Sequence, residues 1–387
     1  MMQGMKNKIL QYPKLFSFLA GWLTVASLPP FYLFPVLFIS LPLLAWLIEK
    51  QNRFGAAFKI GYVFGFAFFA FGLLWIGNAL LIEAKSFGWL YPVVWLASGA
   101  FFGLFIAFPA ALCRYAPTPT TRYISFACWW VVFEWLRSWF LTGFPWNLIG
   151  TTLAFSDRAI QPASLGGTYL LSLIVLLLAG TPYFYLSSST KKQRIKTVLS
   201  ILIAGGIIYG YGYARLKSDT KEEGNTTVRI VQPAIPQTMK WDKASLEQNL
   251  QRYIDLSTEE SNSDIDFTIW GETAVPFPQN IDYPQLQNII PAIPPHGYLI
   301  TGLIRYIREN NSFIPYNSMF VVTPQGKIID FYDKSHLVPF GEYIPLREYL
   351  PDWIRPLANA IGTFGSGNGP KSIKLPSQPP FGGLICY

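Results

Sequence analysis

The sequence predicts two structural parts, a polytopic α-helical membrane bundle followed by an α/β domain. Three observations support this prediction. Hydrophobic residues make up 51% of the 387 residues and charged residues only 13%, a composition far from that of an average soluble protein. The apolar residues concentrate in long runs before residue 214. After residue 228, short β-type runs alternate with helical stretches, as in a layered α/β domain.

Seven apolar segments in the first part approach or reach the roughly 20 residues that a membrane helix needs. They lie at 15–29, 31–48, 57–80, 88–112, 123–141, 162–186 and 197–214. The first follows three lysines and resembles a signal peptide, but the six segments behind it favour a retained anchor. We therefore expect a seven-helix membrane domain at 1–214.

Basic residues alternate between the two ends of this predicted bundle. Twelve lysines and arginines lie at the N-terminus and in the loops after the second, fourth and sixth segments: Lys6, Lys8, Lys14, Lys50, Arg53, Lys59, Arg114, Arg122, Lys191, Lys192, Arg194 and Lys196. The other loops hold little beyond Lys85 and Arg158. By the positive-inside rule, the N-terminus is cytoplasmic and everything beyond Arg215 lies on the outer side.

The net charge of +8 belongs mostly to these loops, which disfavours a nucleic-acid partner. Residues 215–227 are polar and predict a linker. After it, we expect strands at 228–232, 267–270, 298–306, 318–323, 327–332 and 382–386. Residues 244–257 predict an amphipathic helix with Leu246, Leu250, Tyr253 and Ile254 on one face.

Three residues suited to covalent catalysis each follow one of these strands: Glu272, Lys334 and Cys386. Because functional groups cluster at the carboxyl ends of strands in α/β sheets, the three side chains could converge. A thiol is mostly protonated at neutral pH and needs a nearby base or cation. Glu272 is suited to take its proton and Lys334 to stabilise an oxyanion. Taken singly, each is equally consistent with an ordinary polar residue at a strand end.

The remaining cysteines and histidines give no sign of a metal site or a disulfide framework. Cys113 and Cys128 lie in or beside apolar segments and are expected to be small buried hydrophobic residues. The chain has only two histidines, His296 and His336, too few for a common zinc ligand set.

Several strings of residues resemble apolipoprotein N-acyltransferase, a membrane-embedded family of the nitrilase superfamily. In the second part these are Gln-Pro-Ala-Ile-Pro-Gln at 232–237 with Lys240-Trp241, Trp-Gly-Glu-Thr-Ala at 270–274, Lys-Ser-His-Leu-Val-Pro-Phe-Gly-Glu-Tyr at 334–343, and Cys386-Tyr387. In the membrane part, Glu134-Trp135-Leu136-Arg137 and Thr-Gly-Phe-Pro-Trp at 142–146 match as well. The resemblance covers the whole chain.

The resemblance implies a nitrilase-like α-β-β-α sandwich at 228–387 with a Glu272, Lys334 and Cys386 triad. It also assigns supporting or substrate-binding roles to Glu342, Tyr387 and Trp241. The implied reaction transfers a fatty acyl group from a phospholipid, through a cysteine thioester, to the N-terminal amine of a diacylglyceryl-cysteine apolipoprotein. No cofactor or metal is implied. The implied location is the bacterial inner membrane, with the catalytic domain on the periplasmic side.

Two departures from the family pattern stand out. Gly271 occupies a position that is usually proline, which loosens the backbone before the base but removes no catalytic group. The family also continues for about a further quarter of its length beyond the nucleophile. We therefore expect the catalytic domain to be C-terminally incomplete and the 387-residue chain to have little transferase activity by itself. A membrane-tethered amidase and an inactive remnant of the acyltransferase remain alternatives.

Two further features allow two interpretations each. Glu134 and Arg137 lie three residues apart in an apolar segment, either as a functional site or as a pair that fixes the bundle. Residues 346–360 carry Tyr349, Leu350 and Trp353 between prolines. They predict either a packed surface helix or a mobile arm that inserts apolar side chains into the bilayer.

Overall fold

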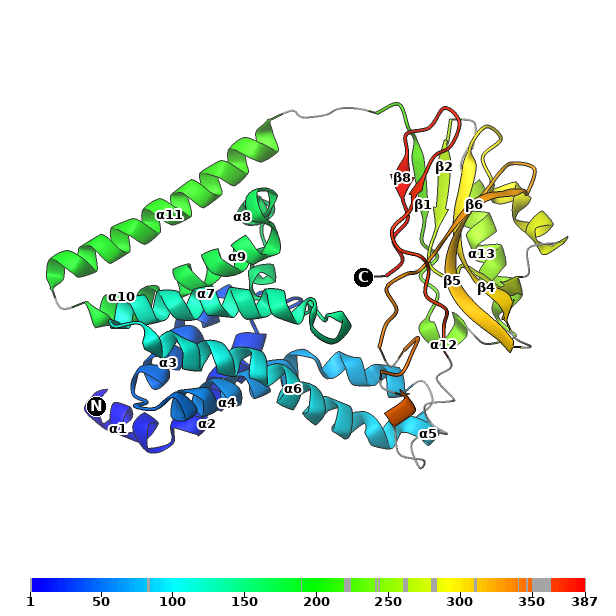
Figure 1. Cartoon of the computed structure of the whole chain (residues 1–387). Coiled ribbons are helices and arrows are strands. Elements are labelled where there is room, and N and C mark those ends of the chain that lie inside the picture. The colour runs from blue at the N-terminus through cyan, green and yellow to red at the C-terminus, as the bar shows by residue number, and fades with distance from the viewer. Residues whose placement is uncertain are drawn as a thin grey trace. The chain divides into compact units, whose positions relative to one another are not determined.

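The computed structural model describes residues 2–81, 84–188, 190–218, 224–240, 242, 244–259, 264–279, 284–309, 312–339, 341–345, 347–349 and 363–386. The chain divides into two compact units, Met1–Lys221 and Glu222–Tyr387, each of which is described by itself (Figure 1).

The described residues of the first unit form helices joined by short irregular segments. Its longer helices are α2 (Pro13–Val25), α3 (Leu37–Glu49), α4 (Phe54–Gly72), α6 (Tyr91–Leu112), α7 (Pro119–Arg137), α9 (Ala163–Ala179) and α11 (Lys191–Lys217). Shorter helices are α1 (Met2–Gln11), α5 (Ala84–Phe87), α8 (Asp157–Ile160) and α10 (Thr181–Ser187). Every one of the seven predicted segments overlaps one of these helices. The last helix is longer at both ends than the segment predicted at 197–214, since α11 runs from Lys191 to Lys217 and includes the basic loop and the start of the predicted linker.

Three stretches of helix among the described residues are long and apolar enough to cross a membrane: Phe54–Gly72, Ala84–Tyr115 and Lys191–Lys217. The bent pair α9 and α10 forms a fourth if it is taken as one span. Helices α2 and α3 have 13 residues each, fewer than the roughly 20 of a full span. The apolar helices make this unit a membrane domain, and seven crossings stay a prediction.

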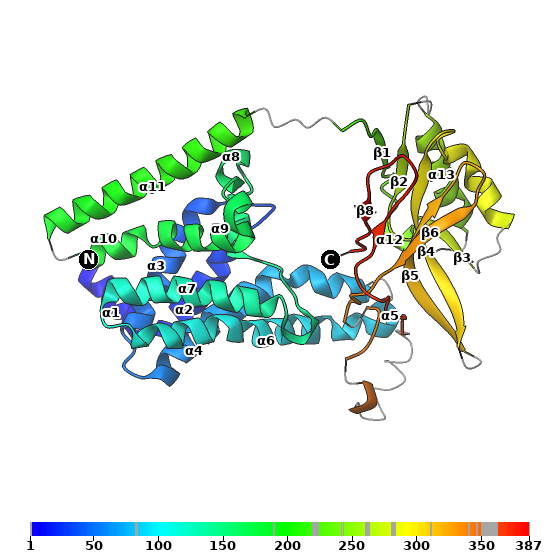
Figure 2. The same ribbon diagram turned by 45° about the horizontal axis from the view of Figure 1, so that its top comes forward.

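Close backbone contacts hold the centre of this unit together. Helices α4 and α6 meet at glycines, and a Cβ atom on Gly65 would lie 2.7 Å from the carbonyl oxygen of Gly103. Small residues of this kind allow membrane helices to approach closely. Beside them, Phe64, Phe68 and Trp130 form a buried aromatic cluster. Helix α11 lies along the outside of the unit, with Gly212 as its one buried residue (Figure 2).

The hydrogen bonds of the buried ionisable residues of α7 go to backbone groups and to Trp130. Glu134 Oε1 accepts hydrogen bonds from the indole of Trp130 at 3.0 Å and from the amide of Ile149 at 2.9 Å. Arg137 Nη1 donates to the carbonyl oxygens of Phe144 and Trp146. Irregular backbone in a membrane domain needs hydrogen-bond partners inside the protein. Glu134 and Arg137 supply such partners to three backbone groups between α7 and the turn at Ile149. This arrangement favours the structural interpretation of the two residues.

The second unit contains a six-stranded mixed sheet. Its strands are β1 (Val228–Val231), β2 (Phe267–Trp270), β3 (Val275–Gln279), β4 (Tyr298–Glu309), β5 (Ser312–Val322) and β6 (Ile328–Asp333). The order is β1-β2-β4-β5-β6, with β3 also paired to β4. Strands β1, β2 and β4 are parallel, and β4, β5 and β6 are antiparallel neighbours. Helices α12 (Gln237–Lys240) and α13 (Leu246–Thr258) and the 3-10 segment Pro284–Ala292 complete the unit, with the short 3-10 turn Arg347–Tyr349.

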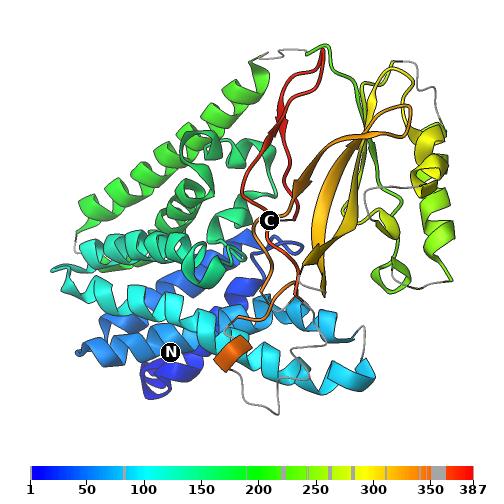
Figure 3. The ribbon, with the colours of Figure 1, turned by 45° about the vertical axis from the view of Figure 1, so that its right-hand side comes forward.

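Each face of this sheet is covered by a different layer. Alternate residues such as Trp270, Leu299 and Phe320 pack with Leu250 and Tyr253 of α13. On the opposite face, Phe267, Ile300 and Val321 pack with Ile373 and Leu375, beside a two-stranded sheet of β7 (Ser372–Ile373) and β8 (Phe381–Gly382). Figure 3 shows the yellow-green helices and the red C-terminal segment on the two sides of the sheet. The predicted combination of helical bundle and layered α/β domain is confirmed.

One strand prediction was wrong, and one strand was not predicted. Residues 382–386 are not one strand of the main sheet, because β8 ends at Gly382 and pairs with β7. A Cβ atom on Gly383 would lie 2.6 Å from the Met319 side chain, so the chain here rests flat on the sheet instead of joining its edge. Strand β3 was not predicted. Its prolines at 276 and 278 cannot donate to a ladder, and it pairs with β4 only at Val275 and Gln279.

Candidate active site

Glu272 stands in a tight turn at the carboxyl end of β2. The strand ends at Trp270, and Thr273 has a positive φ of 48°. This turn rests directly on β4, where the amide of Gly302 donates to the carbonyl oxygen of Gly271 at 3.3 Å. A Cβ atom on Gly302 would lie 2.6 Å from the Thr273 nitrogen and 2.8 Å from the Glu272 Cα. The position of Glu272 therefore depends on the absence of a side chain at Gly302.

Lys334 follows β6 and forms a buried ion pair with Glu342. The Lys334 ammonium lies 3.0 Å from Glu342 Oε1 and 2.9 Å from Oε2, with the two side chains 2% and 12% exposed. Glu342 Oε2 also accepts from the amide of Val338 at 2.9 Å. The Lys334 carbonyl accepts from the amide of Gly367. Because a buried ammonium is costly without an anion, Glu342 supplies the partner that lets Lys334 lie in this buried position.

Asn317 on β5 joins these two sites. Its Nδ2 donates to Glu272 Oε1 at 2.6 Å and to Glu342 Oε1 at 3.1 Å. Its backbone carbonyl also accepts from the amide of Lys334 at 2.8 Å. The structure therefore connects Glu272, Asn317, Glu342 and Lys334 in one hydrogen-bonded chain.

The two glutamates differ in how many acceptor positions they have left. Both oxygens of Glu342 accept from Lys334, and each accepts one further hydrogen bond. Glu272 is exposed, and its Oε2 accepts no hydrogen bond from any residue the structure describes. A general base needs an oxygen that can reach a substrate proton. Among the described residues, Glu272 has such an oxygen, whereas both oxygens of Glu342 are already occupied.

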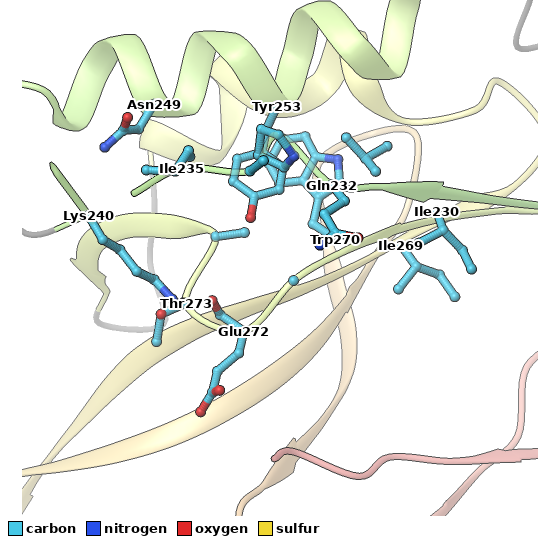
Figure 4. Close-up of a pocket in the computed structure, with 15 residues that line it drawn as sticks. Ile230, Gln232, Ile235, Lys240, Asn249, Tyr253, Ile269, Trp270, Glu272 and Thr273 are labelled. Carbon is cyan, nitrogen blue, oxygen red and sulfur yellow. Dashed lines mark hydrogen bonds between the residues drawn. The ribbon is translucent and has the colours of Figure 1, made fainter. Parts of the chain in front are cut away.

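A pocket of about 390 Å³ lies beside the Glu272 turn, between the ends of β1 and β2 and the two helices α12 and α13. Lys240 reaches across it, and its ammonium donates to the Glu272 carbonyl at 2.9 Å. Burial lowers the pKa of Lys240, while the nearby Glu272 carboxylate opposes this shift. Figure 4 shows Lys240 directed at Glu272 and Thr273, with the Glu272 carboxylate pointing away from Tyr253 and Asn249 of α13. Lys240 thus supports the backbone of the turn through the Glu272 carbonyl and not through the carboxylate.

Cys386 follows a segment that lies on the same face of the sheet as Asn317 and Lys334. Gly383 packs against Met319 of β5 and Tyr332 of β6. Asn317 is two residues from Met319 and Lys334 two residues from Tyr332, so each pair shares a face. Cys386 is exposed with a positive φ of 60°. Across the residues that the structure describes, no hydrogen bond or ion pair joins its thiol to Glu272 or Lys334.

The other predicted residues have mixed outcomes. Trp241 and Tyr387 lie outside the described residues, and so does most of the 346–360 segment, of which residues 347–349 form a 3-10 turn with Tyr349 exposed. Cys113 is buried as predicted. The prediction for Cys128 was wrong, because it lies exposed on the side of α7 away from its buried residues. Within the described ranges, no group of three or more His, Cys, Asp or Glu side chains could hold a metal ion.

Asn317 and Lys240 were not predicted as individual site residues. Asn317 lies one residue before the strand predicted at 318–323, and β5 begins earlier, at Ser312. A polar residue beside a strand gave no reason to expect contact with two glutamates. Lys240 was noted only as part of a matching string, since nothing local indicates that its ammonium reaches the Glu272 carbonyl.

Comparisons with known proteins agree with this division of the chain. Residues 20–181 match the family model "Apolipoprotein N-acyltransferase N-terminal domain", and residues 227–387 match "Carbon-nitrogen hydrolase".

Similar curated proteins named apolipoprotein N-acyltransferase occur in several bacteria. The chain is 34% identical to that of Rickettsia typhi, over 97% of this chain and 74% of the relative. It is 33% identical to the Rhodopseudomonas palustris protein, over 95% and 72%, and 32% identical to the Brucella melitensis protein, over 96% and 73%.

Proposed function

The chain belongs to the apolipoprotein N-acyltransferase family, and from this premise we propose that Cys386 carries the acyl group as a thioester between donor and acceptor. The family makes the chain a membrane-bound acyltransferase of lipoprotein biosynthesis. The finer assignments below are proposals: the triad of Glu272, Lys334 and Cys386, a phospholipid as donor, and a diacylglyceryl-cysteine N-terminus as acceptor.

In the first step, Glu272 takes the proton of the Cys386 thiol, and the sulfur attacks the ester carbonyl of a fatty acyl chain. The carbonyl oxygen becomes an oxyanion that the Lys334 ammonium stabilises. The ester C–O bond then breaks, and the leaving alkoxide takes the proton from Glu272. A lysophospholipid departs, and the acyl group remains on sulfur.

In the second step, the free α-amine of the acceptor attacks the thioester carbonyl. Glu272 now takes a proton from the amine, and Lys334 again faces the oxyanion. The C–S bond breaks, the new amide is released, and the proton returns to the Cys386 sulfur. Two moderate barriers thereby replace one high barrier.

The free oxygen of Glu272 is the observation that supports this proposal best. Its Oε1 is bound by Asn317, and its Oε2 accepts from no residue in the described ranges, which leaves it for a substrate proton. The saturated Glu342 instead balances the charge of Lys334. We assign Trp241 and Tyr387 supporting roles at the substrate, on the basis of the family alone.

We also propose that the second unit faces the periplasm from the bacterial inner membrane. The support is the alternation of basic loops in the first unit, since cytoplasmic loops carry an excess of lysine and arginine. A donor lipid and a lipid-modified acceptor both reach such a domain from the membrane surface.

The test uses the protein extended with the C-terminal quarter of a relative, because the chain matches 74% of the Rickettsia typhi protein. This protein is supplied in vesicles with a phospholipid labelled in its acyl chain and a synthetic diacylglyceryl-cysteine peptide. We expect the label in an amide on the peptide, and none when Cys386→Ala replaces the parent protein. Release of ammonia from simple amides without labelled peptide would instead support a carbon-nitrogen hydrolase and overturn the proposal.

A further inference from the structure

We propose that Asn317 is a positioning residue that holds the Glu272 carboxylate in its working orientation and couples it to the Lys334–Glu342 pair. This proposal rests on the proposed function in one respect, the use of Glu272 as the base. It concerns a residue outside the triad, on a strand to which the family motifs quoted above do not extend.

The hydrogen-bonding pattern fixes which way the Asn317 amide points. Its side chain lies between two carboxylates, Glu272 Oε1 at 2.6 Å and Glu342 Oε1 at 3.1 Å. An amide oxygen in that place would face two acceptors, whereas the NH₂ group offers one hydrogen to each. Both N–H groups are therefore used, one for each glutamate.

This orientation costs stability, which argues against a purely structural role. Asn317 is 4% exposed, and its Oδ1 is buried without a hydrogen-bond donor among the described residues. Buried polar atoms are nearly always paired, and an unpaired one costs about 1–3 kcal/mol. An apolar side chain here would avoid that cost but would leave Glu272 Oε1 without its donor.

Asn317 is well placed to transmit the geometry of the sheet to the site. It lies in the middle of the long β4–β5 pairing, opposite Ile304, and its carbonyl accepts from the Lys334 amide at 2.8 Å. Backbone and side chain of one residue thus fix the positions of Lys334, Glu342 and Glu272. Sites carried on regular strands are held more precisely than sites on loops.

Electrostatics explain why the residue at 317 must be a neutral donor. The charged groups around it are Glu272, Glu342, Lys334, the Lys240 ammonium at the Glu272 carbonyl, and the buried Arg305–Asp333 pair that receives the Ser318 hydroxyl. A hydrogen bond to a carboxylate favours its charged form, and a nearby like charge disfavours it. Alanine at 317 removes the first effect, and aspartate adds the second.

The test compares Asn317→Ala and Asn317→Asp with the parent protein in the labelled-phospholipid assay. We expect kcat to fall about 10–100-fold, the range of a lost hydrogen bond to a charged group, with KM for the acceptor peptide within about twofold. Because both variants hold the Glu272 proton more tightly, the acid limb of the pH–rate profile should move to higher pH. The shift should be larger for Asn317→Asp, and raising the pH should restore part of the lost rate.

A matched control is Asn288→Asp, the same chemical change at an exposed position of the 3-10 segment. It should leave the profile unchanged. Asn317→Asp hardly changes the shape of the side chain, so the variant should fold. A melting temperature near that of the parent shows that a loss of rate comes from a misplaced Glu272 and not from misfolding. A folded Asn317→Asp with the parent pH profile, or loss of rate by the same factor at every pH, would overturn the proposal. Transfer that survives in Cys386→Ala would instead refute the proposed thioester and leave the Asn317 result readable.

Discussion

Both carboxylate oxygens of Glu342 lie within 3.0 Å of the Lys334 ammonium, and the Lys334 side chain is 2% exposed. This buried pair presents one cation beside the Glu272 carboxylate, held there through Asn317. A positive charge already in place before the reaction needs no reorganisation when an oxyanion forms.

The Lys334–Glu342 pair should matter for both rate and stability. Lys334→Ala should lower acyl transfer about 10²–10³-fold, the usual cost of one oxyanion donor. Glu342→Gln leaves a buried ammonium without its anion, so the free energy of unfolding should fall by about 3–5 kcal/mol. Thermal unfolding and the labelled-lipid assay measure the two effects.

The control for that pair is Lys371→Ala, which breaks the more exposed ion pair with Asp330. A surface pair contributes about 0–1 kcal/mol, so the melting temperature should hardly change. Equal shifts of the melting temperature in Glu342→Gln and Lys371→Ala would refute the claim that the buried Lys334–Glu342 pair contributes more to stability than a surface pair.

Gly302→Ala should displace the Glu272 turn. The added Cβ would come within 2.8 Å of Glu272 Cα and Gly271 O, both backbone atoms that cannot rotate away. We expect a loss of about 1–3 kcal/mol in stability, as for other overpacked cores, together with a lower transfer rate. Gly224→Ala, which meets nothing within 4 Å, is the matched control. Unchanged transfer by Gly302→Ala would mean that the turn tolerates movement.

Lys240 should make stability depend on alkaline pH. Burial lowers its pKa in the folded protein below the usual value of 10.5. In the window between the two values the unfolded chain holds the proton and the folded chain does not, so this group adds stability as pH rises toward 10.5. That contribution is lost as pH falls through the folded pKa. The difference in unfolding free energy between the parent and Lys240→Met should therefore grow in favour of the parent as pH rises toward 10.5. A difference that is constant with pH would contradict the assigned shift.

The orientation of the chain can be tested with a fusion after residue 225. The twelve basic residues at the N-terminus and in alternate loops place this point outside the cytoplasm. A reporter that is active only in the cytoplasm should be silent there, and one that needs the periplasm should be active. A strong cytoplasmic signal would reverse the proposed topology.

The sequence predicted those strands of the second unit whose apolar side chains alternate between the two faces of the sheet. Phe267 and Ile269 face one side of β2 and Trp270 the other, and this periodicity was visible in the sequence. The Glu272 and Lys334 positions followed from their places at strand ends. The hydrogen-bond partners of these two residues could not be predicted, because Asn317 and Glu272 are 45 residues apart in the sequence.

The errors have equally local causes. Apolar residues at 382–386 suggested a strand, but Gly383 is needed for flat packing on Met319 and Tyr332, and the ladder ends before it. Strand β3 was not predicted because its prolines are unfavourable in a strand, and it pairs with β4 at only two positions. For the membrane unit, apolar run length located the longer helices from α2 onward but not α1, α5 and α8. The buried contacts of Glu134 and Arg137 with the backbone depend on tertiary structure.

The central claim is that Cys386 becomes acylated by a phospholipid, and mass measurement of the intact protein tests it most directly. After incubation with labelled phospholipid and no acceptor, we expect the mass to increase by one acyl chain, and neutral hydroxylamine to remove it. Cys128→Ala, which removes the exposed cysteine of α7, should still gain the label, and Cys386→Ala should not. An acyl adduct of equal yield on Cys386→Ala, or none on the parent protein while it transfers label to the peptide, would contradict the thioester mechanism.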